Sequence, residues 1–262
     1  MSLSRPYPRS RWTAAGVEAG ARDLAEETAI ALVHDAVTTA VMMATPADLE
    51  DFGIGFSLTE GLVRSPDEIT ALEVVPAEGG IEVRMWLRQP ASAALAARRR
   101  TLAGPTGCGL CGIDSLAEAV RTPPPVPAGF TVSPATIHRA LAELEPAQAL
   151  GSTTRAAHAA AWWADGIVAL REDVGRHNAL DKLAGAMARA GTKAEGGLLL
   201  LTSRVSVEMV QKAAVMGVQV LVAVSAPTAL AVRTAQAAGM TLVAVAREDA
   251  FEVFTGAVRI TS

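Results

Sequence analysis

The chain has 262 residues with 23 basic and 27 acidic side chains, a formal charge of −4. Half of the residues are apolar, enough at this length for one large domain or two modest ones with buried cores. The acidic balance argues against a general nucleic-acid binder. No apolar run approaches the roughly 20 residues of a membrane span, and no secretory-signal pattern opens the chain. We therefore expect a soluble, cytoplasmic protein without a nucleic-acid or membrane partner.

The N-terminal half predicts a flexible tail over residues 1–24, followed by an α+β domain over residues 25–121. The tail holds Arg5, Arg9 and Arg11 among prolines and serines, a composition typical of disordered termini. In the domain, Thr45-Pro46 supplies the N-cap and first residue of a helix, and apolar alternation predicts strands. The expected elements are strands over 29–33, 38–44, 71–75 and 81–87, and helices over 46–60 and 90–101.

The only two cysteines, Cys108 and Cys111, lie in the stretch Gly104-Pro105-Thr106-Gly107-Cys108-Gly109-Leu110-Cys111-Gly112. Glycine leaves the backbone unrestrained, so this stretch predicts a loop that can move or be approached closely. Residues 113–120 have helical spacing, and a nearby helix N-terminus favours a thiolate. The two cysteines are therefore the candidate catalytic residues.

Four interpretations of the Cys-x-x-Cys pair remain open. A structural zinc site would need two further ligands, and the four histidines are scattered, so we expect no metal. A thioredoxin-like redox pair would follow an early strand and begin a long helix. A structural disulfide suits secreted proteins. A persulfide carrier, in which one thiolate accepts a sulfur atom and hands it on, suits a mobile cysteine that must meet two partners.

The C-terminal half predicts a layered α/β domain over residues 131–262, behind a stiff Pro-rich linker over 122–130. Ser133 and Pro134 cap a helix that runs to about Leu144. The further expected elements are strands over 157–164, 166–170, 197–201, 220–224 and 241–245, and helices over 176–190, 205–216 and 227–238.

Polar residues follow four of these strands, at Glu172–Asn178, Thr202–Ser206, Ser225–Thr228 and Arg247–Asp249. Ligands of open α/β sheets bind outside the carboxyl ends of the strands, and three of these junctions lead into helix N-termini, which attract anions. A phosphate-bearing or nucleotide-like ligand is therefore expected, although the hydroxyls could equally be helix caps. Neither GxGxxG nor the Walker motif occurs, so a standard Rossmann or P-loop site is not supported. His177 fits a general acid or base, an anion contact or a structural hydrogen-bond hub.

Several stretches together resemble the formate dehydrogenase accessory sulfurtransferase family of the FdhD/NarQ type. The resemblance covers most of residues 25 to 256, and its motifs are far more specific than a lone Cys-x-x-Cys. The matching stretches are Met43–Phe52, Gly55-Phe56, Thr59-Glu60-Gly61, the Gly-Cys-Gly-Leu-Cys-Gly loop, Glu172–Ala179, Ser203-Arg204-Val205-Ser206, Glu208–Lys212 and Ser225–Thr228.

The resemblance implies a sulfur carrier. In that family a cysteine desulfurase loads the first loop cysteine, here Cys108, as a persulfide, and the sulfur passes to the molybdenum bis(molybdopterin guanine dinucleotide) cofactor before insertion into formate dehydrogenase. Cys111 would assist release through a transient disulfide. The resemblance also implies a three-layer, cytidine-deaminase-like α/β domain and a homodimer. The zinc signature of true deaminases is absent, so deamination is not implied. The rival functions are a cofactor-binding chaperone that moves no sulfur and a thiol–disulfide oxidoreductase.

The expected cofactor residues come from two arguments. The family's guanine-dinucleotide segment maps here to Val245, Ala246, Arg247, Glu248, Asp249 and Ala250, and the strand-end argument adds Ser203, Arg204, Ser225, Thr228 and His177. Three positions depart from the family pattern. Arg155 stands where a small residue is common, Glu248-Asp249 brings two acids to the cofactor segment, and His34-Asp35 replaces an Asn-Gly turn.

Overall fold

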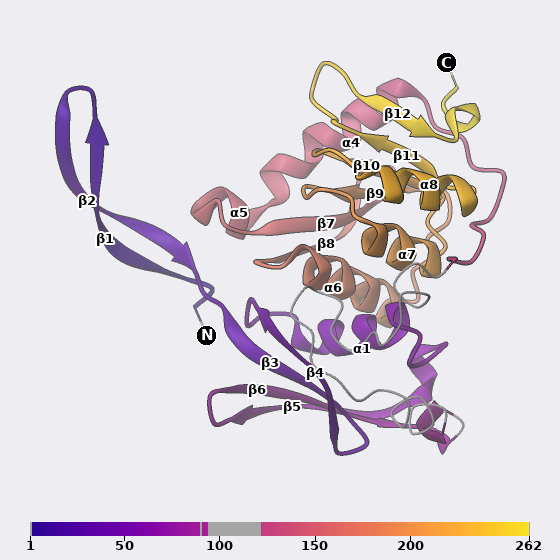
Figure 1. Cartoon of the computed structure of the whole chain (residues 1–262), viewed down its shortest axis with the longest axis horizontal. Coiled ribbons are helices and arrows are strands. Elements are labelled where there is room, and N and C mark those ends of the chain that lie inside the picture. The colour runs from indigo at the N-terminus through magenta and orange to yellow at the C-terminus, as the bar shows by residue number, and fades with distance from the viewer. Residues whose placement is uncertain (1, 90, 94–121, 262) are drawn as a thin grey trace.

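The computed structural model describes residues 2–89, 91–93 and 122–261 (Figure 1). Cys108, Cys111 and most of the helix expected over 90–101 lie outside these ranges. The described strands form a two-stranded hairpin, a four-stranded sheet and a six-stranded sheet. Figure 1 shows the hairpin protruding from the other two parts, with helices packed on both sheets. Within the described ranges, no helix is both long and apolar enough to cross a membrane.

The first part is a β-hairpin where a flexible tail was expected. Strands β1 (Ser4–Thr13) and β2 (Gly16–Ala25) pair antiparallel along their whole length. Thr13 Oγ1 accepts the Ala15 N–H at 3.2 Å and so tightens the turn between them. Pro6 and Pro8 suggested disorder, but proline is tolerated in a two-stranded ribbon, where each strand has an open edge. Because nearly every side chain of the ribbon is exposed, it lacks the burial pattern that identifies a strand from sequence.

The second part is a four-stranded sheet in the order β4-β3-β6-β5. Its strands are β3 (Thr28–His34), β4 (Val37–Ala44), β5 (Ile69–Ala77) and β6 (Gly80–Leu87), which confirms the four expected strands. Strands β3 and β6 are parallel and the other pairs are antiparallel. Helix α1 (Leu49–Thr59) contributes Phe52 and Phe56 to the core over this sheet. A short 3₁₀ turn, η1 (Pro66–Glu68), precedes β5.

The expected cap of this helix is wrong. The N-cap is Asp48, at a positive φ of 53°, and not Thr45. Thr45 is fully buried; its backbone N–H donates to Asp173 Oδ2 at 3.0 Å, and its Oγ1 accepts the Val174 N–H at 3.2 Å. A contact with a residue 128 positions away has thus replaced the local capping bond.

The third part is a six-stranded sheet in the order β12-β11-β10-β9-β7-β8. Its strands are β7 (His158–Trp163), β8 (Ile167–Asp173), β9 (Leu198–Leu201), β10 (Val220–Ala223), β11 (Thr241–Ala244) and β12 (Glu252–Thr255). Strands β9, β10 and β11 are parallel, whereas β7 is antiparallel to both β8 and β9. The carboxyl ends of β8, β9, β10 and β11 therefore share one edge, as expected. Strand β12 was not predicted; it runs antiparallel to β11.

Helices cover both faces of this sheet, so the domain has three layers. Leu199 and Leu201 point to one core and Leu198 and Leu200 to the other. The first core lies under α6 (Arg176–Arg189), α7 (Val207–Val215) and α8 (Ala229–Ala237), and the second lies under α4 (Pro134–Ala147), which leads into the unpredicted short helix α5 (Ala149–Thr154). The fold is mixed α/β; the specific likeness to cytidine deaminases stays a prediction. A 3₁₀ turn, η2 (Ala257–Arg259), follows β12.

Candidate functional site

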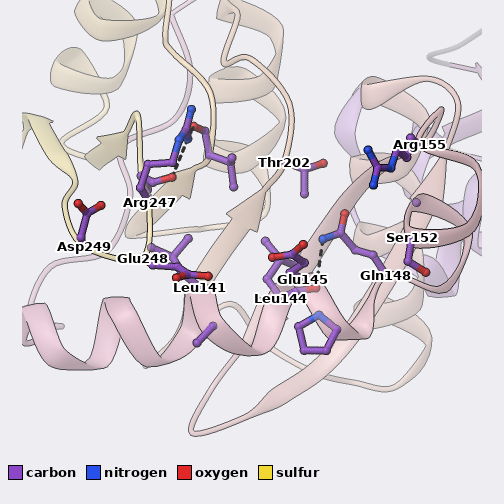
Figure 2. A pocket seen from close by; sticks show the side chains of 15 residues that line it. Leu141, Leu144, Glu145, Gln148, Ser152, Arg155, Thr202, Arg247, Glu248 and Asp249 are labelled. Carbon is purple, nitrogen blue, oxygen red and sulfur yellow. Dashed lines mark hydrogen bonds between the residues drawn. The ribbon is translucent and has the colours of Figure 1, made fainter. Parts of the chain in front are cut away.

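A large pocket with both polar and apolar lining residues opens at the shared edge of the six-stranded sheet (Figure 2). Its cavity volume is about 1270 Å³, above the range of about 300–1,000 Å³ that is typical of small-molecule sites. Helices α4 and α5 form one wall, and the loop after β11 forms the other. The lining residues are Leu141, Ala142, Leu144, Glu145, Pro146, Gln148, Gly151, Ser152, Arg155, Thr202, Val224, Ala246, Arg247, Glu248 and Asp249.

The loop after β11 brings four of the predicted cofactor residues into this pocket: Ala246, Arg247, Glu248 and Asp249. The loop turns at Val245, whose φ is 52°, and the Arg247 N–H donates to the Ala250 carbonyl at 2.8 Å, which closes the turn. The Arg247 guanidinium donates to the carbonyls of Val224 and Ala246, so it is fixed across the ends of β10 and β11. Val245 and Ala250 shape the loop without lining the pocket.

Arg155 stands across the pocket from Arg247, with Glu145 between them in Figure 2. It follows α5 as the C-cap at a φ of 57°, a region that favours glycine. Its guanidinium makes no hydrogen bond or ion pair with any described residue. The α5 wall is held by Glu172, whose carboxylate accepts the N–H groups of Leu150 and Gly151 at 2.8 and 2.7 Å.

The other predicted cofactor residues do not line the pocket. Thr228 caps α8, accepting the Ala231 N–H at 3.2 Å, and the buried Ser203 hydroxyl donates to the Arg204 carbonyl at 3.0 Å. The capping interpretation of Thr228 is therefore confirmed. Arg204 and Ser225 also lie outside the lining. Helix α4 was predicted, but its residues were given no role in the site, and no sequence signal identified α5. Arg155 was noted only as a departure from the family pattern.

His177 lies away from the pocket, as the second residue of α6 on the opposite face of the sheet. Burial and the positive charges of Arg176 and Lys212 lower its pKa from 6.5 to about 4, against the opposing effect of Glu208 and Glu60. The imidazole is therefore neutral near pH 7. His177 belongs to a polar group at the N-termini of α6 and α7 and not to the pocket wall.

Behind His177, Lys212 joins three parts of the chain. Its Nζ donates to Glu60 Oε1 at 2.6 Å, to Asp181 Oδ1 at 2.9 Å and to Thr59 Oγ1 at 3.0 Å. Burial opposes the charge on Lys212, but the two carboxylates outweigh it and raise the lysine pKa. Burial also raises the pKa of Asp181, and Lys212 opposes that change. This network binds the end of α1 to α6 and α7.

The fold and the pocket together define a mixed α/β protein with a pocket of mixed polarity, large enough for a nucleotide, at the edge of its six-stranded sheet. Residues 25–261 match the FdhD/NarQ family, and the chain belongs to that family. It is 52% identical over 244 residues to the sulfur carrier protein FdhD of Agrobacterium fabrum, covering 92% of this chain and 90% of the relative. It is 49% identical over 247 residues to the Cupriavidus necator protein of the same name, covering 94% and 86%.

A solved structure shares the whole fold. It is a Desulfotalea psychrophila protein provisionally described as a formate dehydrogenase accessory protein, and it matches with a TM-score of 0.80 at 25% sequence identity. The match covers 99% of this chain and all of that one. The structural match therefore extends over the hairpin and the two sheets, whereas the family match begins at residue 25, the last residue of the hairpin.

Proposed function

We propose that this protein is a sulfur carrier in molybdenum cofactor maturation. A cysteine desulfurase supplies sulfur, Cys108 carries it as a persulfide, and the acceptor is the molybdenum bis(molybdopterin guanine dinucleotide) cofactor destined for formate dehydrogenase. The observation that carries the proposal is that the chain's only thiols form a Gly-Cys-Gly-Leu-Cys-Gly motif in a protein similar over nearly its whole length to sulfur carriers.

The two cysteines suffice for a balanced transfer. The Cys108 thiolate attacks the outer sulfur of the donor's persulfide, the donor's S–S bond breaks, and the donor leaves as a thiolate. For release, the Cys111 thiolate attacks Cys108 Sγ, and the outer sulfur leaves as sulfide with the electron pair of the broken S–S bond. The two thiols become a disulfide, which supplies the two electrons that the sulfur gains. Free thiolates need a reducing compartment, which favours the cytoplasm.

In this proposal the pocket holds the guanine-nucleotide part of the acceptor. The Arg155 guanidinium has no partner among the residues that the structure describes, and an arginine fork matches phosphate oxygens. Glu145, Glu248 and Asp249 would repel phosphate, but carboxylates accept hydrogen bonds from the N–H groups of a guanine base. The mixed lining therefore suits a ligand that carries phosphate at one end and N–H donors at the other.

The sulfur step is tested by incubating the protein with a desulfurase and cysteine and then measuring its intact mass. We expect one added sulfur atom on the wild type and on Cys111→Ser, and none on Cys108→Ser. A chaperone that moves no sulfur would still activate formate dehydrogenase as Cys108→Ser. An oxidoreductase would instead form a stable Cys108–Cys111 disulfide and depend equally on both thiols.

The pocket is tested by calorimetry with GDP, a probe that carries both the base and the phosphates. We expect the wild-type protein to bind GDP, and to bind ADP more weakly, because adenine lacks the N1–H that guanine presents. Equal affinities for GDP and ADP would overturn the assignment of the acidic residues to the base, and no binding of either would overturn the nucleotide site.

The proposal also includes a homodimer. It is supported by the β1–β2 hairpin, which extends away from the rest of the chain in Figure 1. The hairpin leaves Tyr7, Trp12, Val17 and Leu24 exposed, with Trp12 at 81%. A two-stranded ribbon is at best marginally stable on its own in water. Packing of these exposed side chains against a second copy of the chain would stabilise the hairpin.

A further inference from the structure

Four buried polar atoms at the N-termini of α6 and α7 have no hydrogen-bond partner among the residues that the structure describes. They are Arg176 Nε, His177 Nε2, Ser206 Oγ and Glu208 Oε2, and we call these four residues the α6/α7 polar group. An unsatisfied buried polar group costs about 1–3 kcal/mol, and such groups are few in native proteins. Four in one region point to a ligand that would satisfy them.

The four side chains come from adjacent helix starts. Arg176 and His177 are the first two residues of α6, Ser206 is the N-cap of α7, and Glu208 is the second residue of α7. Neither helix has a side-chain cap on its first turn, so the free N–H groups of two helices add partial positive charge here. Both Arg176 of α6 and Glu208 of α7 are close enough to the His177 ring to act on it electrostatically. The two helix starts therefore lie side by side at this histidine.

The charges that face His177 limit the ligand. Arg176 from α6 and Lys212 from α7 are positive, and Glu208 from α7 and Glu60 after α1 are negative. Lys212 is already engaged by Glu60 and Asp181. Of the described cations that act on His177, Arg176 is thus the one left for a ligand, and Glu208, whose Oε2 has no partner in the described ranges, would oppose a multiply charged phosphate. The group therefore suits a single negative charge in a small space.

We propose that the α6/α7 polar group binds an anionic sulfur, a thiolate or a persulfide, during sulfur transfer. This inference rests on the proposed function. The thiol S–H bond breaks, its proton goes to water, and the electron pair stays on sulfur, to which Arg176 and Ser206 donate. The thiolate then attacks the outer sulfur of the donor persulfide, and the pair of the broken S–S bond leaves with the donor sulfur. Neutral His177 adds a hydrogen bond without adding charge.

The bound sulfur has two sources, this chain's own cysteine or the incoming donor, and two assays distinguish them. Both use the full chain as Cys111→Ser, so that Cys108 is the single thiol. The first assay follows alkylation of Cys108 by iodoacetamide between about pH 5 and about pH 9 by intact mass, which reads the thiolate fraction. The second follows sulfur uptake from glutathione persulfide.

The test variant is Arg176→Gln, and the control is Arg233→Gln, an exposed arginine on α8. If the site holds this chain's sulfur, Arg176→Gln raises the alkylation midpoint by about one pH unit, which slows the reaction about tenfold at neutral pH. If it holds the donor's sulfur, uptake falls about tenfold while alkylation is unchanged. Arg176→Lys should restore part of either effect, and Arg233→Gln should change neither.

Ser206→Ala is the second variant, with an expected effect of about threefold in the same assay; it also serves if Arg176→Gln does not fold. Unchanged alkylation and uptake in the folded variants overturn the inference. If the wild type itself takes up no sulfur from either a desulfurase or the glutathione persulfide, the proposed function fails. The alkylation midpoints remain a separate measurement of the α6/α7 polar group.

Discussion

Lys182 Nζ lies 2.6 Å from Asp173 Oδ2, and both side chains are completely buried. Asp173 also accepts the N–H groups of Thr45 and Gly175, at 3.0 and 2.7 Å, while Lys182 donates to the Thr45 carbonyl at 2.8 Å. This ion pair therefore joins the end of β8 to α6 and to the loop before α1. The junction that the sequence suggested as a ligand loop is, at Asp173, a connection between the two sheets.

Removing one member of this pair should destabilise the protein strongly. Asp173→Ala leaves the Lys182 ammonium buried without its carboxylate, which typically costs about 3–5 kcal/mol. Urea unfolding followed by circular dichroism measures the change. The matched control is Asp165→Asn, since Asp165 pairs with Arg139 on the surface and is 87% exposed; an exposed pair contributes at most about 1 kcal/mol. Similar losses from the two substitutions would contradict this account.

Helices α1 and α6 approach closely through Gly55 and Gly185, so a methyl group there should separate them. A Cβ on Gly55 would lie 1.7 Å from the Asp181 carbonyl oxygen, and one on Gly185 would lie 1.9 Å from that of Asp51. Overpacking of this kind costs at least about 1–3 kcal/mol, and we expect the upper end for Gly55→Ala because the obstacle is backbone.

The control for this substitution is Gly20→Ala in β2, where the nearest atom to a new Cβ is Arg9 Nη2 at 4.0 Å. Thermal unfolding of both variants checks the prediction. If Gly55→Ala unfolds at the same temperature as Gly20→Ala, the helix contact is looser than the structure indicates.

How far the sequence predicts the fold depends on burial. The run Ile81–Leu87 alternates between buried and partly exposed positions, and the observed strand Gly80–Leu87 agrees within one residue. The hairpin of residues 4–25 and strand β12 were missed because few of their side chains are buried, so no apolar period marks them. Helix α5 has only six residues, too few for a periodic pattern.

The site residues that follow a strand could be predicted from the order of the strands. Those held in place by hydrogen bonds between residues far apart in the sequence could not. Arg247 to Asp249 enter the pocket because they follow β11 at the shared sheet edge, as expected from the strand pattern, and Ala246 was expected from the family resemblance. The opposite wall depends on Glu172 binding the amides of Leu150 and Gly151, more than 20 residues earlier. No local pattern encodes that bond, and the position of Arg155 depends on it.

Arg155 offers a variant that should separate ligand binding from stability. Because Arg155 adopts a φ of 57°, Arg155→Gly keeps the backbone conformation while it removes the charge. We expect the free energy of unfolding to change by less than about 1 kcal/mol, and the Kd for GDP to rise about tenfold through loss of a charged hydrogen bond. Calorimetry with GDP and urea unfolding measure the two quantities. Arg139→Gln, which removes an α4 arginine that pairs with Asp165 and does not line the pocket, should leave the Kd unchanged. An unchanged Kd in Arg155→Gly would exclude Arg155 as a phosphate ligand.

Stability should fall in mild acid because of His177. Its pKa is lowered from 6.5 to about 4 in the folded protein, by burial and by Arg176 and Lys212. Between these values the unfolded chain binds a proton that the folded chain does not, so the free energy of unfolding decreases as the pH falls from 6.5 towards 4. The whole loss is about 3 kcal/mol at most.

His177→Gln should flatten this part of the pH dependence. The measurement is the urea midpoint of both proteins at about pH 7 and about pH 5. Burial, Arg176 and Arg204 also lower the pKa of His158. His158→Gln should therefore also reduce the loss of stability in acid, but by less than His177→Gln. A slope in His177→Gln equal to that of the wild type would mean that other groups cause the acid sensitivity.

The hairpin should be dispensable for folding and necessary for dimerisation. Removing residues 1–25 takes away β1 and β2. In the described part of the chain these strands pair only with each other and with no strand of the other two sheets, although β2 also contacts α5. The two sheets should therefore unfold at nearly the wild-type denaturant midpoint. If the hairpin contacts a second copy, that copy covers the exposed side chains of Trp12 and Tyr7, and the truncation removes this contact. Sedimentation equilibrium should then give a dimer for the full chain and a monomer for the truncated one, with Trp12→Ser weakening the dimer about tenfold. A truncated chain that stays dimeric would assign the dimer interface to the body of the protein and not to the hairpin.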